Sequence, residues 1–482
     1  MRYPYLITSF FIFTGSLLGF SQTPCENNFA GEYPCQDYDL LANIPVSVLA
    51  NEQGNPEGSD LWGWTDPLTN KEYAIAGMTN STAFIEVTDP VNPVFLGRLD
   101  TNAGTSYWRD VKIYNNHAFI VADNVGAHGM QVFDLTKLRS VTTPPTTFTA
   151  DAIFDEVGSC HNIVINETTA MAYLVGCNTF SGGLVFVDIS DPVNPVGKGG
   201  YTEEGYTHDA QVVTYNGPDS AYVGKEILIG SNENKVVILD VSNKSNVLKI
   251  AEIGYEQIGY THQGWFTEDH AYFIVGDETD EQNFGMNTRT LVFDFTDLDN
   301  PVLSNTYLGT TEAIDHNGYV KEDTFFMANY SAGMRVLDIT NISASSNAMT
   351  EIGYFDTHPT SDAASFNGAW SVYPYFASGN IIINDIERGL FIVRKSGTLH
   401  TDELEISENF SVYPNPSAGS TTLQISSDKK ITSIAIYNVL GKKVFYSDTI
   451  DQSKYVLSLQ DFSKGLYLLK VNGTLTKKII LN

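Results

Sequence analysis

The sequence predicts an all-β protein: a seven-bladed β-propeller followed by a small Ig-like β-sandwich. The first observation is a hexapeptide, DPVNPV, that occurs at residues 89–94 and again at 191–196. The second is that the surrounding pattern of four short apolar strands recurs about every 46 to 54 residues, with no helical periodicity between the copies. The third is a change of composition after Lys395, which indicates a second domain.

The hexapeptide is predicted to connect two strands of a hairpin. Each copy follows an apolar, β-branched run and precedes another, as in GLVFVDISDPVNPVGKG from Gly183, and weaker copies begin at Lys235 and Thr290. Proline lacks the N–H that a strand ladder needs, so the prolines belong in a turn or at an edge. The repetition is therefore architectural, and none of its residues forms a nucleophile or an acid–base pair.

Seven such units are expected, and the last is incomplete. They begin near Ser59, Thr105, Ser159, Tyr206, Tyr260, Ile314 and Asn367. The seventh unit contains only three strands, whereas an unused apolar stretch, Tyr38–Ala50, precedes the first unit. Because an open sheet edge invites aggregation, we expect this stretch to supply the missing outer strand and close the ring.

The N-terminus predicts export. Arg2 and an interrupted apolar run at residues 5–20 resemble a signal peptide, here residues 1–21; the alternative is an uncleaved anchor. No later segment is apolar enough to span a bilayer, so no transmembrane span is expected in the mature protein. An exported chain favours disulfides, and sequence proximity favours Cys25–Cys35 and Cys160–Cys177 among the three possible pairings.

Charge restricts the partners. The net charge of −30 argues against nucleic acid and against anionic membranes. Residues 408–482 differ from the rest, because they contain nine Lys and only five Asp or Glu. The polar stretch 396–407 is predicted to be a linker, and the alternating strands after it predict the sandwich.

Two family resemblances follow from these residues. The segment TPCENNFAGEYPCQDYDLLANIPVSVL from Thr23, LWGWTD at 61–66 and the LVFVDISDPVNPV hairpins resemble the LVIVD-repeat, choice-of-anchor B family. This resemblance covers residues 25–395 and implies an extracellular propeller; the family has no agreed activity. YPNP at 413–416, GKK at 441–443 and GLY at 465–467 resemble the type A C-terminal sorting domain of the type IX secretion system.

The second resemblance implies a route and a partner. It implies that the type IX machinery recognises residues 408–482 and exports the protein through a Gram-negative outer membrane, where it is released or attached to the cell surface. A carbohydrate-binding sandwich is the alternative interpretation of this tail, but the sequence shows no aromatic platform for sugars.

The candidate site is a ring of polar residues. We find no nucleophile, phosphate-binding or HExxH motif, and the acidic stretch 277–285 is expected to be an exposed loop, since it lacks the spacing of a calcium loop. In the repeat register the inner strands start at Gly63-Trp64, Arg109-Asp110, His161-Asn162, His208-Asp209, His262-Gln263, His316-Asn317 and Ala369-Trp370. Inner strands of a propeller line its channel. We therefore expect these side chains, and loops such as Asp123-Asn124 and Asp277-Glu278, to share one mouth.

Two interpretations of the ring remain open. The histidines can hold neighbouring blades together by hydrogen bonds. They can instead bind a ligand or a divalent metal ion, with His161, His208, His262 and His316 as the metal ligands. The five tryptophans, all in inner-strand segments, are expected to pack between blades. Our functional hypothesis is an extracellular binding or adhesion module without catalysis. The alternative is a metal-dependent hydrolase or lyase that acts on an extracellular polymer at the histidine-lined mouth.

Overall fold

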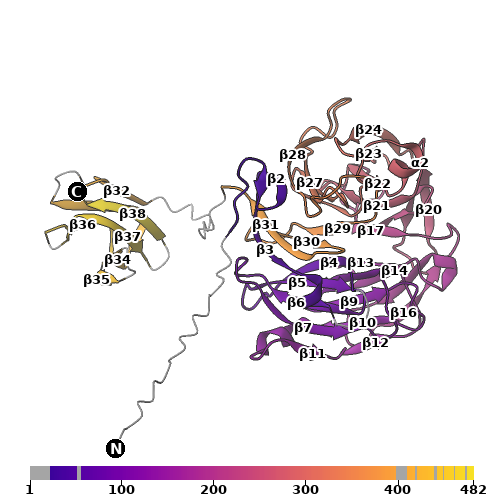
Figure 1. Cartoon of the computed structure of the whole chain (residues 1–482), viewed down its shortest axis with the longest axis horizontal. Coiled ribbons are helices and arrows are strands. Elements are labelled where there is room, and N and C mark those ends of the chain that lie inside the picture. The colour runs from indigo at the N-terminus through magenta and orange to yellow at the C-terminus, as the bar shows by residue number, and fades with distance from the viewer. Residues whose placement is uncertain are drawn as a thin grey trace, which may run out of the picture. The chain divides into compact units, whose positions relative to one another are not determined.

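The computed structural model describes residues 22–50, 56–397, 410–417, 421–438, 442–448, 450–460, 462–472 and 475–481. They form two compact units, divided between residues 398 and 399 (Figure 1). The predicted signal peptide 1–21 and all but the first two residues of the predicted linker 396–407 lie outside the described residues. In the part of the chain that is described, no helix has the length and apolarity needed to cross a membrane.

The first unit is built from antiparallel sheets whose strands follow one another from the inside outward. Among the described residues there are seven such sheets, which we call blades 1 to 7. Blade 1 contains β4 (Gly58–Thr65), β5 (Glu72–Met78), β6 (Ser81–Glu86) and β7 (Val94–Asp100), with β11 (Thr146–Phe148) parallel to β7. Blade 2 contains β8 (Arg109–Tyr114), β9 (His117–Ala122), β10 (Met130–Asp134) and β12 (Ala152–Phe154), and a 3-10 helix, η1 (Leu135–Ser140), follows β10. Blade 3 contains β13 (Asn162–Asn166), β14 (Met171–Val175), β15 (Leu184–Asp188) and β16 (Val196–Tyr201), with η2 (Phe180–Gly182) before β15.

The remaining blades follow the same order. Blade 4 contains β17 (Asp209–Thr214), β18 (Glu226–Ser231), β19 (Val236–Asp240) and β20 (Leu248–Ile253). Blade 5 contains β21 (Thr261–Phe266), β22 (Tyr272–Asp277), β23 (Arg289–Asp294) and β24 (Val302–Leu308), with the helix α2 (Asp280–Phe284) between β22 and β23. Blade 6 contains β25 (Gly318–Lys321), β26 (Thr324–Ala328), β27 (Met334–Asp338) and β28 (Thr350–Phe355). Blade 7 contains β29 (Ala369–Tyr373), β30 (Asn380–Asp385) and β31 (Gly389–Lys395).

The blades surround a common axis. The inner strands contact each other in the order β4, β8, β13, β17, β21, β25, β29 and back to β4, which makes a closed ring. In Figure 1 the labels β4, β13, β17 and β29 lie near the middle of this unit, and β7, β16, β20 and β24 lie at its rim. The predicted all-β propeller class is confirmed.

The N-terminal segment closes the ring. β3 (Tyr38–Ile44) pairs antiparallel with β31, with Tyr38 opposite Lys395 and Ile44 opposite Leu390. The predicted strand over Tyr38–Ala50 is therefore too long: a short helix, α1 (Val46–Leu49), follows Pro45 and buries Val46 and Leu49. The hairpin of β1 (Phe29–Ala30) and β2 (Tyr33–Gln36) extends blade 6 through β28, and the Cys25–Cys35 disulfide fastens it.

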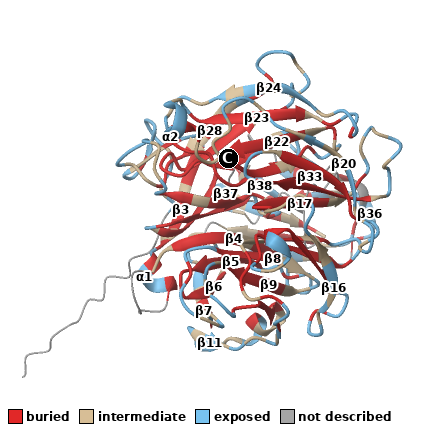
Figure 2. Ribbon diagram, turned by 90° about the vertical axis from the view of Figure 1, so that its right-hand side faces the viewer, coloured by how far each residue is buried: buried red, intermediate tan, exposed pale blue. Residues whose placement is uncertain are grey.

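Burial falls from the inner strands to the outer ones. Every residue of β5 is buried, as are all but the first of β22, whereas most residues of β20 and β24 are exposed or half-buried (Figure 2). The β-branched and aromatic residues of the inner three strands therefore form the cores between blades. Each such side chain contributes about 1.5–3 kcal/mol on burial.

The repeated hexapeptide forms the same turn twice. Asn92 donates its backbone N–H to the Asp89 carbonyl at 3.1 Å and its side-chain amide to the Asp89 carboxylate at 3.0 Å. Asn194 repeats both bonds to Asp191 at 3.0 and 2.9 Å. The Asp and the Asn of DPVNPV thus close a turn between the third and fourth strands of blades 1 and 3.

The acidic stretch 277–285 differs from the prediction. Only residues 282–285 of the stretch are exposed, because Asp277, Asp280 and Glu281 are almost fully buried and residues 280–284 form α2. Arg289 offsets part of the free-energy cost of burying Asp280, because its Nε donates a hydrogen bond to that carboxylate at 2.6 Å. The second predicted disulfide, Cys160–Cys177, is present and joins the start of blade 3 to the end of its second strand.

The second unit is a small sandwich of two antiparallel sheets. Its strands are β32 (Phe410–Tyr413), β33 (Thr422–Ile431), β34 (Ile434–Asn438), β35 (Lys443–Ser447), β36 (Gln452–Ser458), β37 (Gly465–Val471) and β38 (Leu475–Leu481). One sheet has the order β32-β33-β36 and the other β35-β34-β37-β38. Its own apolar core includes Leu423, Ile436 and Leu469, all fully buried.

Candidate functional site

Four histidines form a continuous row at one end of the inner strands. His161, His208, His262 and His316 stand at or just before the start of the inner strands of blades 3 to 6. Because neighbouring inner strands lie side by side, their rings meet. The ring centroids are 4.3 Å apart for His161 and His208, 4.4 Å for His208 and His262, and 4.2 Å for His262 and His316. We call these four side chains the histidine row.

Hydrogen bonds fix the tautomers of three members of the row. His208 directs Nδ1 to the carbonyl of His262 at 3.1 Å, and His316 directs Nδ1 to the carbonyl of Trp370 at 2.6 Å. A carbonyl oxygen only accepts, so each of these Nδ1 atoms carries the proton and each Nε2 keeps a lone pair. His161 directs Nδ1 to the Asp123 carboxylate at 3.0 Å. His262 differs, because its buried Nδ1 has no partner among the described residues.

The buried imidazoles are neutral at ordinary pH. Burial holds the pKa of His208, His262 and His316 well below the usual value, and neighbouring imidazoles lower it further. Desolvation disfavours the charged ring, and a row of close rings cannot all carry positive charge. The row therefore presents hydrogen-bond acceptors and metal ligands rather than cations.

A carboxylate faces the middle of the row. Glu278, in the turn after β22, places one oxygen 3.7 Å from His262 Nε2 and the other 3.6 Å from His316 Nε2. Tyr330 holds this carboxylate by donating its hydroxyl at 2.8 Å. Ligand atoms of His208, His262 and Glu278 all lie within 4.8 Å of one another, which is the type of grouping that can hold a metal ion.

Arg109 does not join the row. Its Nε donates to the Met78 carbonyl at 3.0 Å, and its Nη1 lies 2.9 Å from Nε2 of His128, another buried residue of blade 2. Burial lowers the pKa of Arg109 to about 10 and that of His128 to about 4. The guanidinium is thus buried between blades 1 and 2, and its hydrogen bonds go to Met78 and His128 rather than to the histidine row.

The predicted aspartates lie with a lysine instead of the histidines. Asp110 accepts from Lys112 Nζ at 2.6 Å, and Asp60 lies 3.7 Å from the same ammonium. Burial raises the pKa of Asp60 to about 7 and that of Asp209 well above its usual range, while Lys112 opposes both shifts. We call Asp60, Asp110, Asp209 and Lys112 the channel cluster.

Hydrogen bonds correct the predicted repeat register in the first and seventh units. Asp60, Asp110 and Asp209 each accept, through one carboxylate oxygen, the N–H of the next residue at 2.6–2.7 Å. Ser59-Asp60, not Gly63-Trp64, is therefore equivalent to Arg109-Asp110. The His208 ring donates to the carbonyl of His262, the equivalent residue of the next blade, and the His316 ring donates in the same way to the carbonyl of Trp370. Trp370-Ser371, rather than Ala369-Trp370, is therefore the equivalent pair in blade 7.

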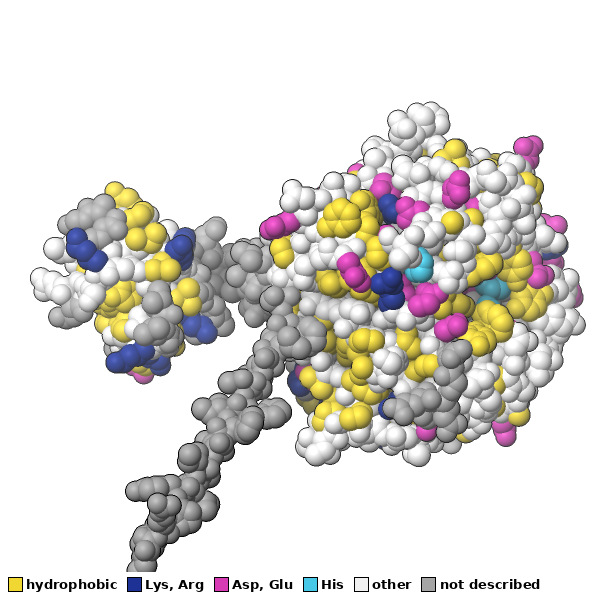
Figure 3. Space-filling view, in the orientation of Figure 1, with side chains coloured by type: hydrophobic (Ala, Val, Ile, Leu, Met, Phe, Trp, Pro, Cys, Tyr) yellow, Lys and Arg dark blue, Asp and Glu magenta, His cyan; other side chains and the backbone are white. Residues whose placement is uncertain are grey.

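Aromatic side chains surround the row. The ring centroids of Tyr260 and His208 are 5.1 Å apart, and those of Trp370 and His316 are 4.9 Å apart. Tyr107, Trp108 and Phe366 keep 47%, 38% and 46% of their surface exposed. Of the five tryptophans predicted to pack between blades, Trp64 is buried and Trp108 is exposed, and the other three, Trp62, Trp265 and Trp370, are half-buried. On the face drawn in Figure 3, acidic side chains are spread around places where histidine reaches the surface.

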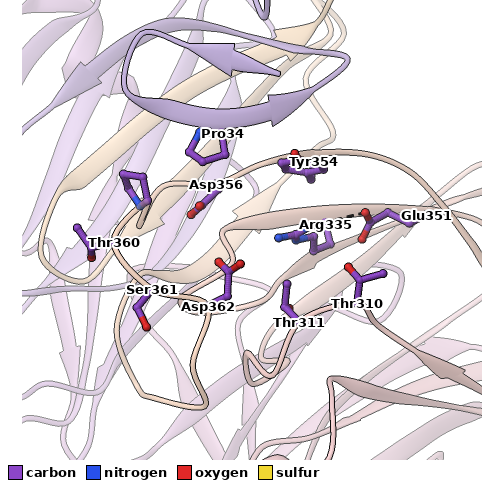
Figure 4. Close-up of a pocket in the computed structure, with 11 residues that line it drawn as sticks. Pro34, Thr310, Thr311, Arg335, Glu351, Tyr354, Asp356, Thr360, Ser361 and Asp362 are labelled. Atoms are coloured by element: carbon purple, nitrogen blue, oxygen red, sulfur yellow. Dashed lines mark ion pairs between the residues drawn. The ribbon is translucent and has the colours of Figure 1, made fainter. Parts of the chain in front are cut away.

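Two cavities lie apart from the histidine row. One, of about 150 Å³, is lined at the far ends of the inner strands by residues such as Trp62, Lys112 and Trp265. The other, of about 460 Å³, lies beside β27 and β28 of blade 6, where Figure 4 shows Arg335 next to Glu351 with Asp356 and Asp362 facing the same space. Glu351 lies 3.5 Å from Nη1 of Arg335 and Tyr354 stacks against its guanidinium, so this cation already has partners.

Comparison with known proteins agrees with this architecture. The LVIVD repeat matches residues 178–203 and 223–250, which fall in blades 3 and 4, and the secretion system C-terminal sorting domain matches residues 411–482. No curated protein matches the chain.

Solved structures with a similar backbone share little sequence. One is PorZ of Porphyromonas gingivalis, a surface component of the type-IX secretion system, at 13% identity and TM-score 0.43; the alignment covers 86% of this chain and 58% of PorZ. A protein of unknown function from Desulfotomaculum acetoxidans has 15% identity and TM-score 0.44, with 64% and 87% covered. The β-propeller domain of Myceliophteria thermophila Cps50 (Swd1) has 8% identity and TM-score 0.44, with 67% and 93% covered.

The two domain matches settle the broad assignment. A sorting domain of this kind indicates secretion and attachment to the cell surface, and it implies interaction with the secretion machinery. Blades 3 and 4, which carry His161 and His208, contain the matched repeats. The chain contains LVIVD repeats within its propeller unit and a secretion system C-terminal sorting domain at residues 411–482.

Proposed function

We propose that this protein is a binding module, displayed on the outer face of a Gram-negative outer membrane, that takes an extracellular ligand at the mouth formed by the histidine row. The ligand is bound without being chemically changed. The observation that carries the proposal is the set of Nε2 lone pairs on His208 and His316, whose Nδ1 atoms are held by carbonyls of the next blade. Acceptors that are oriented in this way and not consumed by the fold are available to a ligand.

The surroundings of the row favour a polymer with hydroxyl groups. Hydroxyls donate to neutral imidazoles and to carboxylates such as Glu278, and sugar rings pack against exposed aromatic faces such as Trp108 and Phe366. The net charge of −34 on residues 1–407 opposes acidic polymers. We therefore expect neutral or amino polysaccharides to bind better than acidic ones.

Affinity electrophoresis of the purified protein tests this function. Gels containing neutral, amino and acidic polysaccharides should retard the protein in at least one of the first two, and His208→Ala/His316→Ala should remove the retardation. His117→Ala is the matched control, because His117 begins β9 at the opposite end of blade 2 from Arg109. Unchanged migration in every gel would contradict the binding role.

One observation favours a second candidate, a metal-dependent hydrolase or lyase. The grouping of His208, His262 and Glu278 has the composition of a catalytic metal site with two histidines and one glutamate. Release of new reducing ends from any of the same polysaccharides would support this candidate and exclude binding without catalysis.

A further inference from the structure

Glu278 and His316 face one another with acceptors on both sides. The Nε2 atom of His316 carries a lone pair, because its Nδ1 proton is committed to the Trp370 carbonyl. A carboxylate is also only an acceptor, yet it lies 3.6 Å from this Nε2 and 3.7 Å from that of His262. Both separations exceed the range of a good hydrogen bond, so no proton shared between these pairs accounts for the arrangement.

The tautomer of His262 is the second observation. His262 is 2% exposed, and its Nδ1 makes no hydrogen bond to any described residue. The other members of the row all have their Nδ1 bonded, so His262 is the member whose proton the fold does not assign to Nδ1. Its Nε2, which faces Glu278, can therefore present a lone pair to a cation.

The separations suit a small cation with nitrogen and oxygen ligands. Zinc binds imidazole nitrogen and carboxylate oxygen at about 2.0–2.2 Å, so tetrahedral ligands lie roughly 3.4 Å apart. The 3.7 Å contact between His262 and Glu278 is close to that value, and the atoms of His208, His262 and Glu278, which lie within 4.8 Å of one another, need only small side-chain adjustments.

Outer partners also hold the ligands as metal sites require. A backbone carbonyl accepts from Nδ1 of His208, and the Tyr330 hydroxyl donates to Glu278 at 2.8 Å. Such contacts orient ligands and tune their basicity at known metal centres. Calcium fits poorly, because it takes six to eight oxygen ligands and imidazole is not among them.

We propose that His208, His262 and Glu278 bind one divalent transition-metal ion of the zinc class. This proposal deepens the proposed function, since it uses the same mouth and rests on the same oriented imidazoles. The ion would bridge the facing acceptors and offer an extracellular ligand a positively charged point within an acidic surface.

Zinc titration of the full-length protein tests the site. The protein is stripped with a chelator, dialysed, and titrated with zinc against a chromophoric chelator. We expect one zinc ion per chain with a dissociation constant below about 1 μM. Glu278→Gln and His262→Ala should each weaken binding by more than about 100-fold, and Tyr330→Phe by about 10-fold, as removal of an outer partner does.

Controls separate loss of ligands from loss of fold. His117→Ala should bind zinc as the parent does. Glu278→Gln keeps the shape of a partly exposed side chain, so the circular dichroism and melting temperature of this variant should match those of the parent. Cobalt added to the stripped protein should give the visible absorption of a tetrahedral nitrogen and oxygen site, and Glu278→Gln should not.

The outcomes distinguish this proposal from the proposed function. A parent protein that binds no zinc stoichiometrically, or whose affinity is unchanged in Glu278→Gln, overturns the metal site, even if polysaccharide gels still retard it. If the protein binds zinc tightly but no gel retards it, the metal site is supported and the proposed polysaccharide ligand is refuted.

Discussion

Closure of the ring by the N-terminal strand makes a quantitative prediction about Leu41. This residue lies in β3, the outer strand of blade 7, and it is 3% exposed. It belongs to a core cluster that joins blade 7 to blade 1 and includes Leu61 and Ile392. Leu41→Ala therefore removes packing at the one junction where the first and last parts of the propeller meet.

The magnitude follows from the burial of this side chain. Leu→Ala at buried positions costs about 2–5 kcal/mol, from lost transfer free energy and the cavity left behind. We expect about 3 kcal/mol, because Ala42 and α1 beside it allow only partial collapse of the cavity. A domain of 150–250 residues loses about 2–4 °C of melting temperature per kcal/mol, and this longer unit should lie near the lower value, which gives a decrease of about 6 °C.

Differential scanning fluorimetry of the purified protein measures the effect. Val48→Ala is the matched control, because Val48 is an apolar residue of α1 that keeps 45% of its surface exposed, and its melting temperature should fall by less than about 1 °C. If Leu41→Ala melts within 1 °C of that control, β3 does not complete blade 7 in solution. Deletion of residues 38–50, which exposes the edge of β31, should go further and cause aggregation.

Three further predictions test other parts of the structure. Removal of residues 408–482 should leave the propeller in the periplasm of its host, and immunoblots that find normal amounts of it outside the cells would contradict the sorting assignment. Burial raises the pKa of Asp60 from 3.8 to about 7, so the folded state keeps a proton that the unfolded state loses between these pH values, and stability falls as pH rises through that window. Asp60→Asn should therefore gain melting temperature relative to the parent between pH 5 and pH 8, and an equal pH dependence in both proteins would refute the assignment. Cys160→Ser/Cys177→Ser should lose about 3 kcal/mol in urea unfolding, as expected for opening a loop of 17 residues, and identical unfolding with and without reductant would show that the bond does not form.

The fold could be predicted because local patterns determine it. Alternating apolar runs, a turn fixed by Asp and Asn, and a seventh unit with three strands were sufficient to place the strands and to assign the closing role of the N-terminal segment. The helical end of that segment was missed, because VSVL has the β-branched composition of a strand and only Pro45 indicates the break. The acidic stretch at 277–285 was assigned to the surface because the sequence pattern does not show that Asp280 pairs with Arg289. That arginine begins the next strand and lies outside the acidic stretch.

The candidate site was predicted in part. Equal spacing identified the histidine row, since the same position of successive blades must meet in space. It could not show which way Arg109 turns, because that depends on His128, a residue outside the repeat. Nor could it reveal the channel cluster: the register of blade 1 was displaced by four residues, so Asp60 was not aligned with Asp110.

The ring position itself argues that the histidines do more than join blades. Blade contacts at this position do not require imidazole: in blade 1 the Ser59 hydroxyl donates to the Arg109 carbonyl, and in blade 2 Arg109 reaches Met78. Imidazole nevertheless occupies the position in four consecutive blades, and in one of them, His262, the Nδ1 atom makes no bond to a neighbouring blade. A purely structural role explains His208 and His316 but leaves His262 and its contact with Glu278 unexplained. A bound cation accounts for the contact between His262 and Glu278, and the choice between these explanations depends on whether Glu278→Gln lowers zinc affinity without lowering the melting temperature.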